Sequence, residues 1–206
     1  MAVFALLYSD TGGGHRTAAG SIKQALDMLY PDHTVRVFNA IRYLPRPFNQ
    51  SEQTYRFSLT YARWMHRLSY ALLDDEWRTK SAARLLLWLD AARLERFICS
   101  AQADVYVSCQ PHFNLFFPPV LRRVAPRARY VHVVTDLSRL HASHIVPTAD
   151  LITTPTEEAR QELLARGVLP SRVITTGQPV APTLQQRIAC AAASRDRHDT
   201  RLRVLL

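Results

Sequence analysis

The chain has 206 residues, and its 26 basic side chains outnumber its 17 acidic ones, which gives a formal net charge of +9. With 48% hydrophobic and 21% charged residues, the composition is that of a folded domain and excludes disorder over most of the length. No apolar run approaches the roughly 20 residues of a membrane span. One candidate run, Leu85–Leu89, lies between Arg84 and Asp90. Because the amino terminus also lacks the basic region of a signal peptide, we expect a soluble, cytoplasmic chain.

The positive charge is carried almost entirely by arginine, since Lys23 and Lys80 are the only lysines. Arginine pairs with phosphate groups and keeps its charge at physiological pH. A basic surface suits nucleic acid, anionic lipid or a nucleotide phosphate, although a GC-rich genome would also raise the arginine content. The cysteines, Cys99, Cys109 and Cys190, are too far apart for a zinc site or a disulfide framework.

Strands and helices are predicted to alternate along the chain. Short apolar or alternating runs between turns indicate strands at Ala2–Tyr8, Thr34–Asn39, Asp104–Ser108, Arg129–Val134, Leu151–Thr154 and Arg172–Thr175. Helical spacing of apolar residues indicates helices at His15–Tyr30, Pro111–Val124 and Glu157–Arg166, the last capped by Thr154 or Thr156. This order predicts an α/β fold with a Rossmann-like, doubly wound parallel sheet, whose ligand lies at the carboxyl ends of the strands.

Two stretches depart from this alternation. Pro45–Leu73 is long for a connection between a strand and a helix. Ser194–Thr200 reads as a polar linker, and Arg201–Leu206 as a buried strand. That strand is either the first of a second domain or the last of the same sheet.

A glycine-rich turn, Thr11–His15 (TGGGH), joins the first strand to the first helix. Such a turn lets backbone N–H groups approach an anion at a helix amino terminus. It is not a P-loop, because no Gly-Lys-Ser/Thr follows. It is a poor dinucleotide-binding motif, because Thr17 takes the place of the third glycine and the second strand ends in Asn39 rather than an acid. The third interpretation of this turn is a phosphate or sugar-diphosphate loop of another α/β enzyme.

His15 is expected in the first turn of the following helix, where the helix dipole disfavours the imidazolium form. A neutral ring near pH 7 can accept a proton from a hydroxyl group as a general base. The alternative is a histidine that only caps or packs.

Thr135 and Asp136 follow a buried strand, so the carboxylate is expected to face the same crevice as His15. There it would orient His15 or a substrate hydroxyl; the alternative is an Asx turn or a helix cap. His141 and His144 lie close behind in the sequence. Because no metal-ligand set accompanies them, we expect no metal and no cofactor.

An aromatic amphipathic helix is expected near residues 55–73. Its apolar face is formed by Phe57, Tyr61, Trp64, Met65, Leu68 and Leu72, and another face by Arg56, Arg63 and Arg67. Such a helix can lie in a membrane interface with its arginines on anionic headgroups. The alternative is a surface helix that packs on the core.

Four segments together resemble a known group: Ser9–Ile22 (SDTGGGHRTAAGSI), Val134–His141 (VTDLSRLH), Ala149–Ala159 (ADLITTPTEEA) and Gly177–Pro182 (GQPVAP). They are similar, in matching order, to the amino-terminal domain of monogalactosyldiacylglycerol synthases. That group includes bacterial diacylglycerol glucosyltransferases and the MurG-like lipid glycosyltransferases of family 28.

The resemblance implies the amino-terminal half of a two-domain GT-B glycosyltransferase. Residues 1–193 would bind the acceptor and the membrane, and residues 194–206 would be the linker and first strand of a missing nucleotide-sugar domain. The implied reaction is inverting transfer of a hexose from a UDP-sugar, as co-substrate, to diacylglycerol. The implied partners are diacylglycerol and an anionic membrane surface, and the implied location is cytoplasmic, peripheral on the inner face of the plasma membrane. The 206-residue chain alone is expected to be inactive.

The resemblance also implies roles for individual residues. His15 is the expected base, and Asp136 carries the acid of the TDL motif. The loop at the donor phosphates and acceptor comprises Thr11, Gly12, Gly13, Gly14 and Arg16. His141 and Gln110 lie on the acceptor side. The expected membrane contacts are Arg56, Phe57, Tyr61, Arg63, Trp64 and Arg67.

Two positions depart from the group's usual pattern. Members often have Trp where this chain has His144, and His-Pro where it has Gln110-Pro111. Both positions touch the acceptor side. Two other functions therefore stay open: a MurG-like transferase with an undecaprenyl-linked acceptor, and a non-catalytic basic module for membranes or nucleic acid. No nucleic-acid motif is found, so we expect no nucleic-acid partner.

Overall fold

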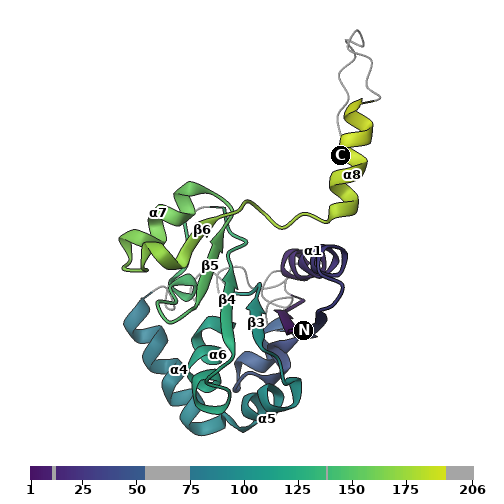
Figure 1. The fold of residues 1–206 in the computed structure, drawn as a ribbon. Helices are drawn as coiled ribbons and strands as arrows, with labels where there is room; N and C mark the ends of the chain where they lie inside the picture. Colours follow the sequence, from purple (N-terminus) through teal and green to yellow (C-terminus); the bar gives the residue numbers. More distant parts are fainter. Residues whose placement is uncertain (11–12, 54–74, 138, 194–206) are drawn as a thin grey trace.

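A six-stranded, fully parallel sheet forms the centre of the computed structural model, which describes residues 1–10, 13–53, 75–137 and 139–193. The spatial order is β2-β1-β3-β4-β5-β6 (Figure 1). The strands are β1 (Val3–Tyr8), β2 (Thr34–Asn39), β3 (Val105–Ser108), β4 (Arg129–Val133), β5 (Leu151–Thr154) and β6 (Val173–Thr175).

The described α-helices are α1 (Gly14–Leu29), α4 (Glu76–Asp90), α5 (Ala92–Ala101), α6 (Phe113–Val124), α7 (Glu157–Ala165) and α8 (Pro182–Ala193). Short 3-10 helices are η1 (Ala40–Tyr43), η2 (Phe48–Gln50), η3 (Ala142–His144) and η4 (Pro170–Arg172). None of the helices within the described ranges has the length and hydrophobicity needed to cross a bilayer.

Helices cover both faces of the sheet. Successive side chains of β1 point to opposite faces, so its apolar residues contribute to a buried cluster on each side. Leu6 packs with Ala18 of α1 in one buried cluster. Ala5 and Leu7 belong to the larger cluster on the other face, where α5 and α6 contribute Phe97 and Phe117 among others. The expected doubly wound, Rossmann-like α/β sheet is confirmed.

All six predicted strands and all three predicted helices form, with ends within two residues of the expected ones. Thr156, rather than Thr154, caps α7, since its Oγ1 accepts a hydrogen bond from the N–H of Ala159 at 3.1 Å. The sequence patterns did not predict α4, α5 or α8. The membrane helix expected near residues 55–73 and the linker and strand expected at residues 194–206 lie outside the described residues.

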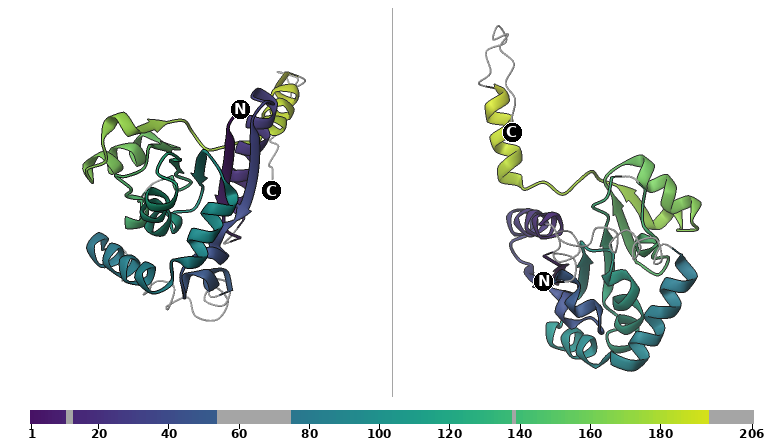
Figure 2. Two further views of the ribbon diagram at one scale, coloured as in Figure 1. Left: turned by 60° about the horizontal axis from the view of Figure 1, so that its bottom comes forward. Right: turned by 180° about the vertical axis from the view of Figure 1, so that it is seen from behind.

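After β6 the chain runs back toward α1, and the first turn of α8 lies close to that helix (Figure 2). The hydroxyl of Thr183 donates a hydrogen bond to Oε1 of Gln24 at 3.2 Å, which joins the two helices. In Figure 1, α4 and α5 lie at the opposite end of the molecule.

A buried amide ties the centre of the fold to the loop that follows β4. Asn114 on α6 accepts a hydrogen bond from the hydroxyl of Tyr130 at 2.9 Å. It also donates from Nδ2 to the carbonyl of Ser143 at 2.9 Å. One side chain therefore fixes β4, α6 and η3 relative to each other.

Replacing this amide should lower stability, because Asn114→Ala removes a hydrogen-bond partner from two buried polar groups, the Tyr130 hydroxyl and the Ser143 carbonyl. We expect the free energy of unfolding in urea to fall by about 2–4 kcal/mol. Gln185→Ala on the exposed face of α8 is the control and should stay within about 0.5 kcal/mol of the unsubstituted chain. Equal unfolding midpoints for the two variants would contradict this account of the network.

Candidate active site

The carboxyl ends of β1, β3 and β4 meet at one edge of the sheet. Leu7, Ser108 and His132 are paired across these strands, so the residues just after them are brought side by side. The strand order reverses between β1 and β3, since the chain passes from β1 to β2 on one side and then to β3 on the other. Connections leave such a point in opposite directions, which opens a crevice for a ligand.

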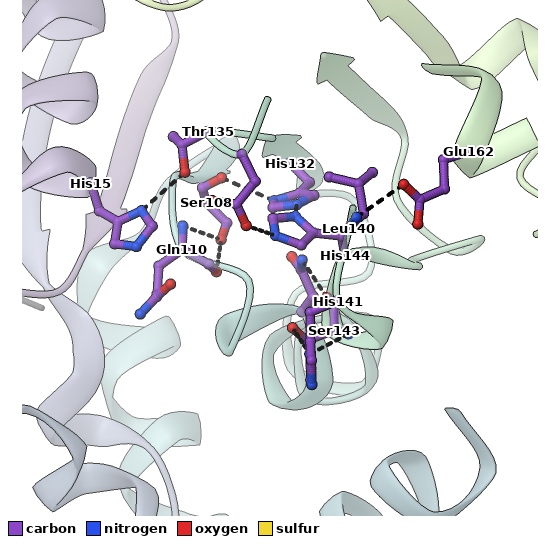
Figure 3. Close-up of polar contacts among 12 residues, drawn as sticks. His15, Ser108, Gln110, His132, Thr135, Leu140, His141, Ser143, His144 and Glu162 are labelled. Carbon is purple, nitrogen blue, oxygen red and sulfur yellow. Dashed lines mark hydrogen bonds and ion pairs between the residues drawn. The ribbon is translucent and has the colours of Figure 1, made fainter. Parts of the chain in front are cut away.

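His15 lies in this crevice at the start of α1. Gly13 precedes the helix with a φ of 80°, a left-handed conformation that favours glycine, and so allows the tight entry from β1. The Nδ1 atom of His15 lies 3.2 Å from Oγ1 of Thr135, which follows β4 (Figure 3). Residues 120 positions apart in the sequence thus meet at the strand ends.

The His15 ring is neutral at pH 7. Burial lowers its pKa below 6.5, while the Asp136 carboxylate and the backbone of Cys109 act in the opposite direction and His144 lowers it further. The expected neutrality is supported, but burial is its largest cause.

Asp136 belongs to a chain of hydrogen bonds that runs into the protein. Its Oδ2 lies 2.8 Å from Nε2 of His144, and Nδ1 of His144 lies 3.0 Å from Nε2 of His132. The Nδ1 atom of His132 lies 3.2 Å from the carbonyl of Ser108. The hydrogen bond from His144 is the main reason why the pKa of Asp136 is lowered, so the carboxylate stays ionised.

Sequence reasoning missed this chain of contacts. A histidine inside the apolar run Arg129–Val134 was the available signal, because a buried imidazole needs partners. The spacing does not identify that partner, since His144 lies beyond an irregular loop.

Three contacts fix the loop that carries Thr135 and Asp136. The carbonyl of Thr135 accepts from Nε2 of Gln178 at 2.6 Å, and the carbonyl of Leu137 accepts from the hydroxyl of Thr156 at 2.8 Å. The N–H of Leu140 donates to Oε2 of Glu162 at 3.0 Å (Figure 3). The positions of the two side chains therefore depend on α7 and on the segment before α8.

Gln110 and His141, the residues expected on the acceptor side, are both buried. Gln110 follows β3, and its Nε2 donates to Oγ of Ser9 at 2.9 Å, which links the ends of β1 and β3. His141 caps η3, where its Nδ1 accepts from the N–H of Ser143 at 3.2 Å. Their acceptor role stays a prediction.

The structure describes some of the remaining predicted site residues and not others. Arg16 is exposed, and its guanidinium nitrogen Nη1 lies 3.7 Å from Oδ1 of Asp10. A Cβ on Gly13 or Gly14 would meet no heavy atom within 4 Å, so that side of the turn is open in the described structure. Thr11, Gly12 and the six expected membrane contacts (Arg56, Phe57, Tyr61, Arg63, Trp64 and Arg67) fall outside the described residues. Within the described ranges, no group of three or more His, Cys, Asp or Glu is placed to hold a metal ion.

A neutral histidine and an ionised carboxylate at the strand reversal of a doubly wound sheet define an α/β protein with a site suited to proton transfer. Comparison with known proteins gives the family. A family model described as "Monogalactosyldiacylglycerol (MGDG) synthase" matches residues 15–180, and the chain belongs to that family.

Relatives of this chain include longer plant proteins. Monogalactosyldiacylglycerol synthase 2, chloroplastic, of Arabidopsis thaliana is 24% identical over 190 residues, covering 89% of this chain and 40% of its own. A probable monogalactosyldiacylglycerol synthase 2, chloroplastic, of Oryza sativa subsp. indica is 27% identical, and the match covers 86% of this chain and 39% of the rice protein. The monogalactosyldiacylglycerol synthase of Spinacia oleracea is 26% identical, and the match covers 89% of this chain and 36% of the spinach protein. The chain thus spans about two fifths of the length of these relatives.

Among solved structures, UDP-N-acetylglucosamine 2-epimerase from Rickettsia bellii matches with a TM-score of 0.46 and 12% identity. The match covers 94% of this chain and 49% of that one.

The electrostatics of the site can be tested by NMR titration of the His15 ring. Asp136→Asn should lower the pKa of His15 further, because it removes the carboxylate that raises it. Asp10→Asn removes the same charge from a residue that pairs with Arg16 and should leave the His15 titration unchanged. A higher His15 pKa in Asp136→Asn would contradict this description.

Proposed function

We propose that this chain is the amino-terminal, acceptor-binding part of a GT-B glycosyltransferase that transfers a hexose from a UDP-sugar to diacylglycerol with inversion. The observation that carries the proposal is a neutral His15 at the strand reversal, held by Thr135 beside ionised Asp136, in a chain of the MGDG synthase family. Residues 1–193 would form the acceptor domain, and residues 194–206 the linker and first strand of the nucleotide-sugar domain.

In this proposal His15 is the general base. In the tautomer that carries its proton on Nδ1, toward the Thr135 hydroxyl, Nε2 has a free electron pair. As the acceptor oxygen attacks the anomeric carbon of the sugar, its proton passes to Nε2. The bond from that carbon to the diphosphate oxygen breaks, and UDP leaves from the opposite face with the bonding electrons, so one displacement inverts the configuration.

Asp136 would stabilise the imidazolium that forms during this step. Its carboxylate already favours the charged form of His15, and it stays ionised through its bond to His144. A negative group near a base that gains a proton lowers the barrier by electrostatic stabilisation. The amino terminus of α1 at Gly13 and Gly14 would offer backbone N–H groups and a positive dipole end to the donor phosphates.

Helix α4 supports the proposed contact with a membrane surface. Trp77 and Trp88 have 77% and 81% of their surface exposed, and their separation of about three helical turns puts both rings on one side. Exposed Arg78 and Arg84 lie on the same helix. Tryptophan and arginine together on an exposed helix suit the interface of an anionic membrane. Because α4 packs against η3, binding there would bring the site close to the lipid.

A second basic feature supports an anionic surface as partner. A shallow pocket of about 460 Å³ is lined by Arg42, Tyr43, Arg93, Arg96, Phe97 and Ser100. The rings of Tyr43 and Phe97, which are part of its lining, stack with centroids 4.4 Å apart. None of its three guanidinium groups forms an ion pair with an acidic side chain of the described chain, although Nε of Arg96 donates to the carbonyl of Ala92 at 3.2 Å. Guanidinium groups of this kind suit phosphate. The proposed location is cytoplasmic, peripheral on the inner face of the plasma membrane.

The transfer reaction is tested in a chimera that joins this chain to the carboxyl-terminal part of the spinach relative. His15→Ala should lower kcat by about 10²- to 10⁴-fold, because it removes the general base. His33→Gln, a histidine outside the site, should leave kcat unchanged. Transfer should also be lost as the pH falls through the His15 pKa, which lies below 6.5, since the protonated ring is no base.

Diacylglycerol and an undecaprenyl-linked lipid should be compared as acceptors in the same assay. Transfer by the purified 206-residue chain alone, or a chimera whose rate is insensitive to His15→Ala, would contradict the proposal.

Membrane binding is tested by flotation of the chain with neutral vesicles, vesicles containing anionic lipid, and anionic vesicles with diacylglycerol. We expect binding to require anionic lipid and to strengthen with diacylglycerol. Trp77→Ala combined with Trp88→Ala should weaken it about tenfold, since two interfacial rings lose their burial. Leu184→Ala with Ile188→Ala removes exposed apolar side chains from α8 and serves as the matched control. Equal binding of both double variants would contradict a role for α4.

A further inference from the structure

Two buried histidines lie in series behind Asp136. The His132 and His144 side chains are wholly buried, whereas 49% of the Asp136 side chain is exposed at the site. Figure 3 shows the two imidazole rings close together, and their centroids are 5.2 Å apart. The arrangement connects an exposed carboxylate to a backbone carbonyl inside the sheet through two ionisable rings.

The number of protons in this chain follows from its ends. The carbonyl of Ser108 only accepts, so Nδ1 of His132 must carry a proton, and Nε2 of the neutral ring must accept one from Nδ1 of His144. The contact between Nε2 of His144 and Asp136 needs a third proton. Two neutral imidazoles supply only two, so the network holds one extra proton.

That extra proton belongs on His144. Burial and the nearby His144 hold the pKa of His132 well below 6.5, although the Ser108 carbonyl and Asp136 act in the opposite direction, so His132 stays neutral. The pKa of Asp136 is lowered, so the carboxyl group does not hold the proton either. With the proton there, both N–H groups of His144 have acceptors and the Asp136 carboxylate lies 2.8 Å away, the condition under which a buried charge is tolerated.

Around the His144–Asp136 pair, the described contacts bring in no further charged side chain. His15 from α1 is the further titratable group that interacts with both rings, and it is neutral. From α6, Asn114 contributes an amide that donates to the carbonyl of Ser143, next to His144. The ion pair with Asp136 is therefore the dominant charge interaction of His144.

We propose that His144, oriented by His132, is a positioning residue that holds Asp136 ionised and fixes its Oδ2 atom, so that the carboxylate keeps its charge for His15. The catalytic consequence rests on the proposed transferase function. An imidazolium donates from both ring nitrogens, so His144 can pair with Asp136 and with His132 at the same time.

The first test measures protonation in the unsubstituted 206-residue chain by nitrogen NMR of labelled histidines at pH 7. We expect both ring nitrogens of His144 to be protonated and His132 to be neutral with its proton on Nδ1. A neutral His144 would overturn the proposal. This measurement depends on neither enzymatic activity nor the folding of a variant.

The second test measures the pKa of the Asp136 carboxyl group by carbon NMR. His144→Gln keeps a donor but removes the positive charge, and should raise this pKa by about 1–2 units. His132→Leu removes the acceptor for Nδ1 of His144 and should shift the Asp136 pKa in the same direction. His33→Gln is the control and should shift it by nothing. A group that serves only packing would leave the pKa unchanged in all three variants, which would overturn the proposal.

Activity separates this proposal from the proposed function. In the spinach chimera, His144→Gln should lower kcat about tenfold, the equivalent of one pKa unit, with the KM for the UDP-sugar unchanged. If the NMR results are as expected but the unsubstituted chimera is inactive, the positioning role stands and the transferase function fails. If the chimera is active but kcat is unchanged in His144→Gln, the positioning role is contradicted.

Discussion

The position of β1 between β2 and β3 is the constraint on which the rest of the site depends. The chain moves outward from β1 to β2 and then returns to the other side, so the connections after β1 and β3 diverge. A crevice opens there, and the parallel register brings the residues after β1, β3 and β4 to its walls. His15, Gln110 and Thr135 meet for this reason, although their separation in the sequence is large.

The same edge is fixed by pairing its buried polar groups. A buried donor or acceptor without a partner costs about 1–3 kcal/mol, so each such group in the loop after β4 restricts where that loop can lie. Asn114 holds η3, Glu162 and Thr156 hold the segment that follows Asp136, and His132 holds His144. The polar contacts that support the fold are thus also those that aim the carboxylate at the site.

Much of this architecture could be predicted from local pattern. Apolar runs, the glycine turn and the cap at Thr156 specify strands and helices through interactions within a few residues, and these were found. Helix α4 has apolar residues on two sides, which hides its helical spacing. Ala83, Leu86 and Leu87 pack against the core, whereas Trp77 and Trp88 are exposed. The contact between His132 and His144 depends on how an irregular loop folds back over the sheet. The local sequence pattern does not show that the His132 and His144 rings come into contact.

The central claim is that this edge of the sheet receives the acceptor lipid. It can be tested most directly with a diacylglycerol that carries a photoreactive group beside its free hydroxyl, cross-linked to the chain in anionic vesicles and mapped by mass spectrometry. The account predicts adducts on the peptides that contain His15, Gln110 and Thr135, and competition by unlabelled diacylglycerol. Adducts confined to other surfaces, or insensitive to that competitor, would contradict it.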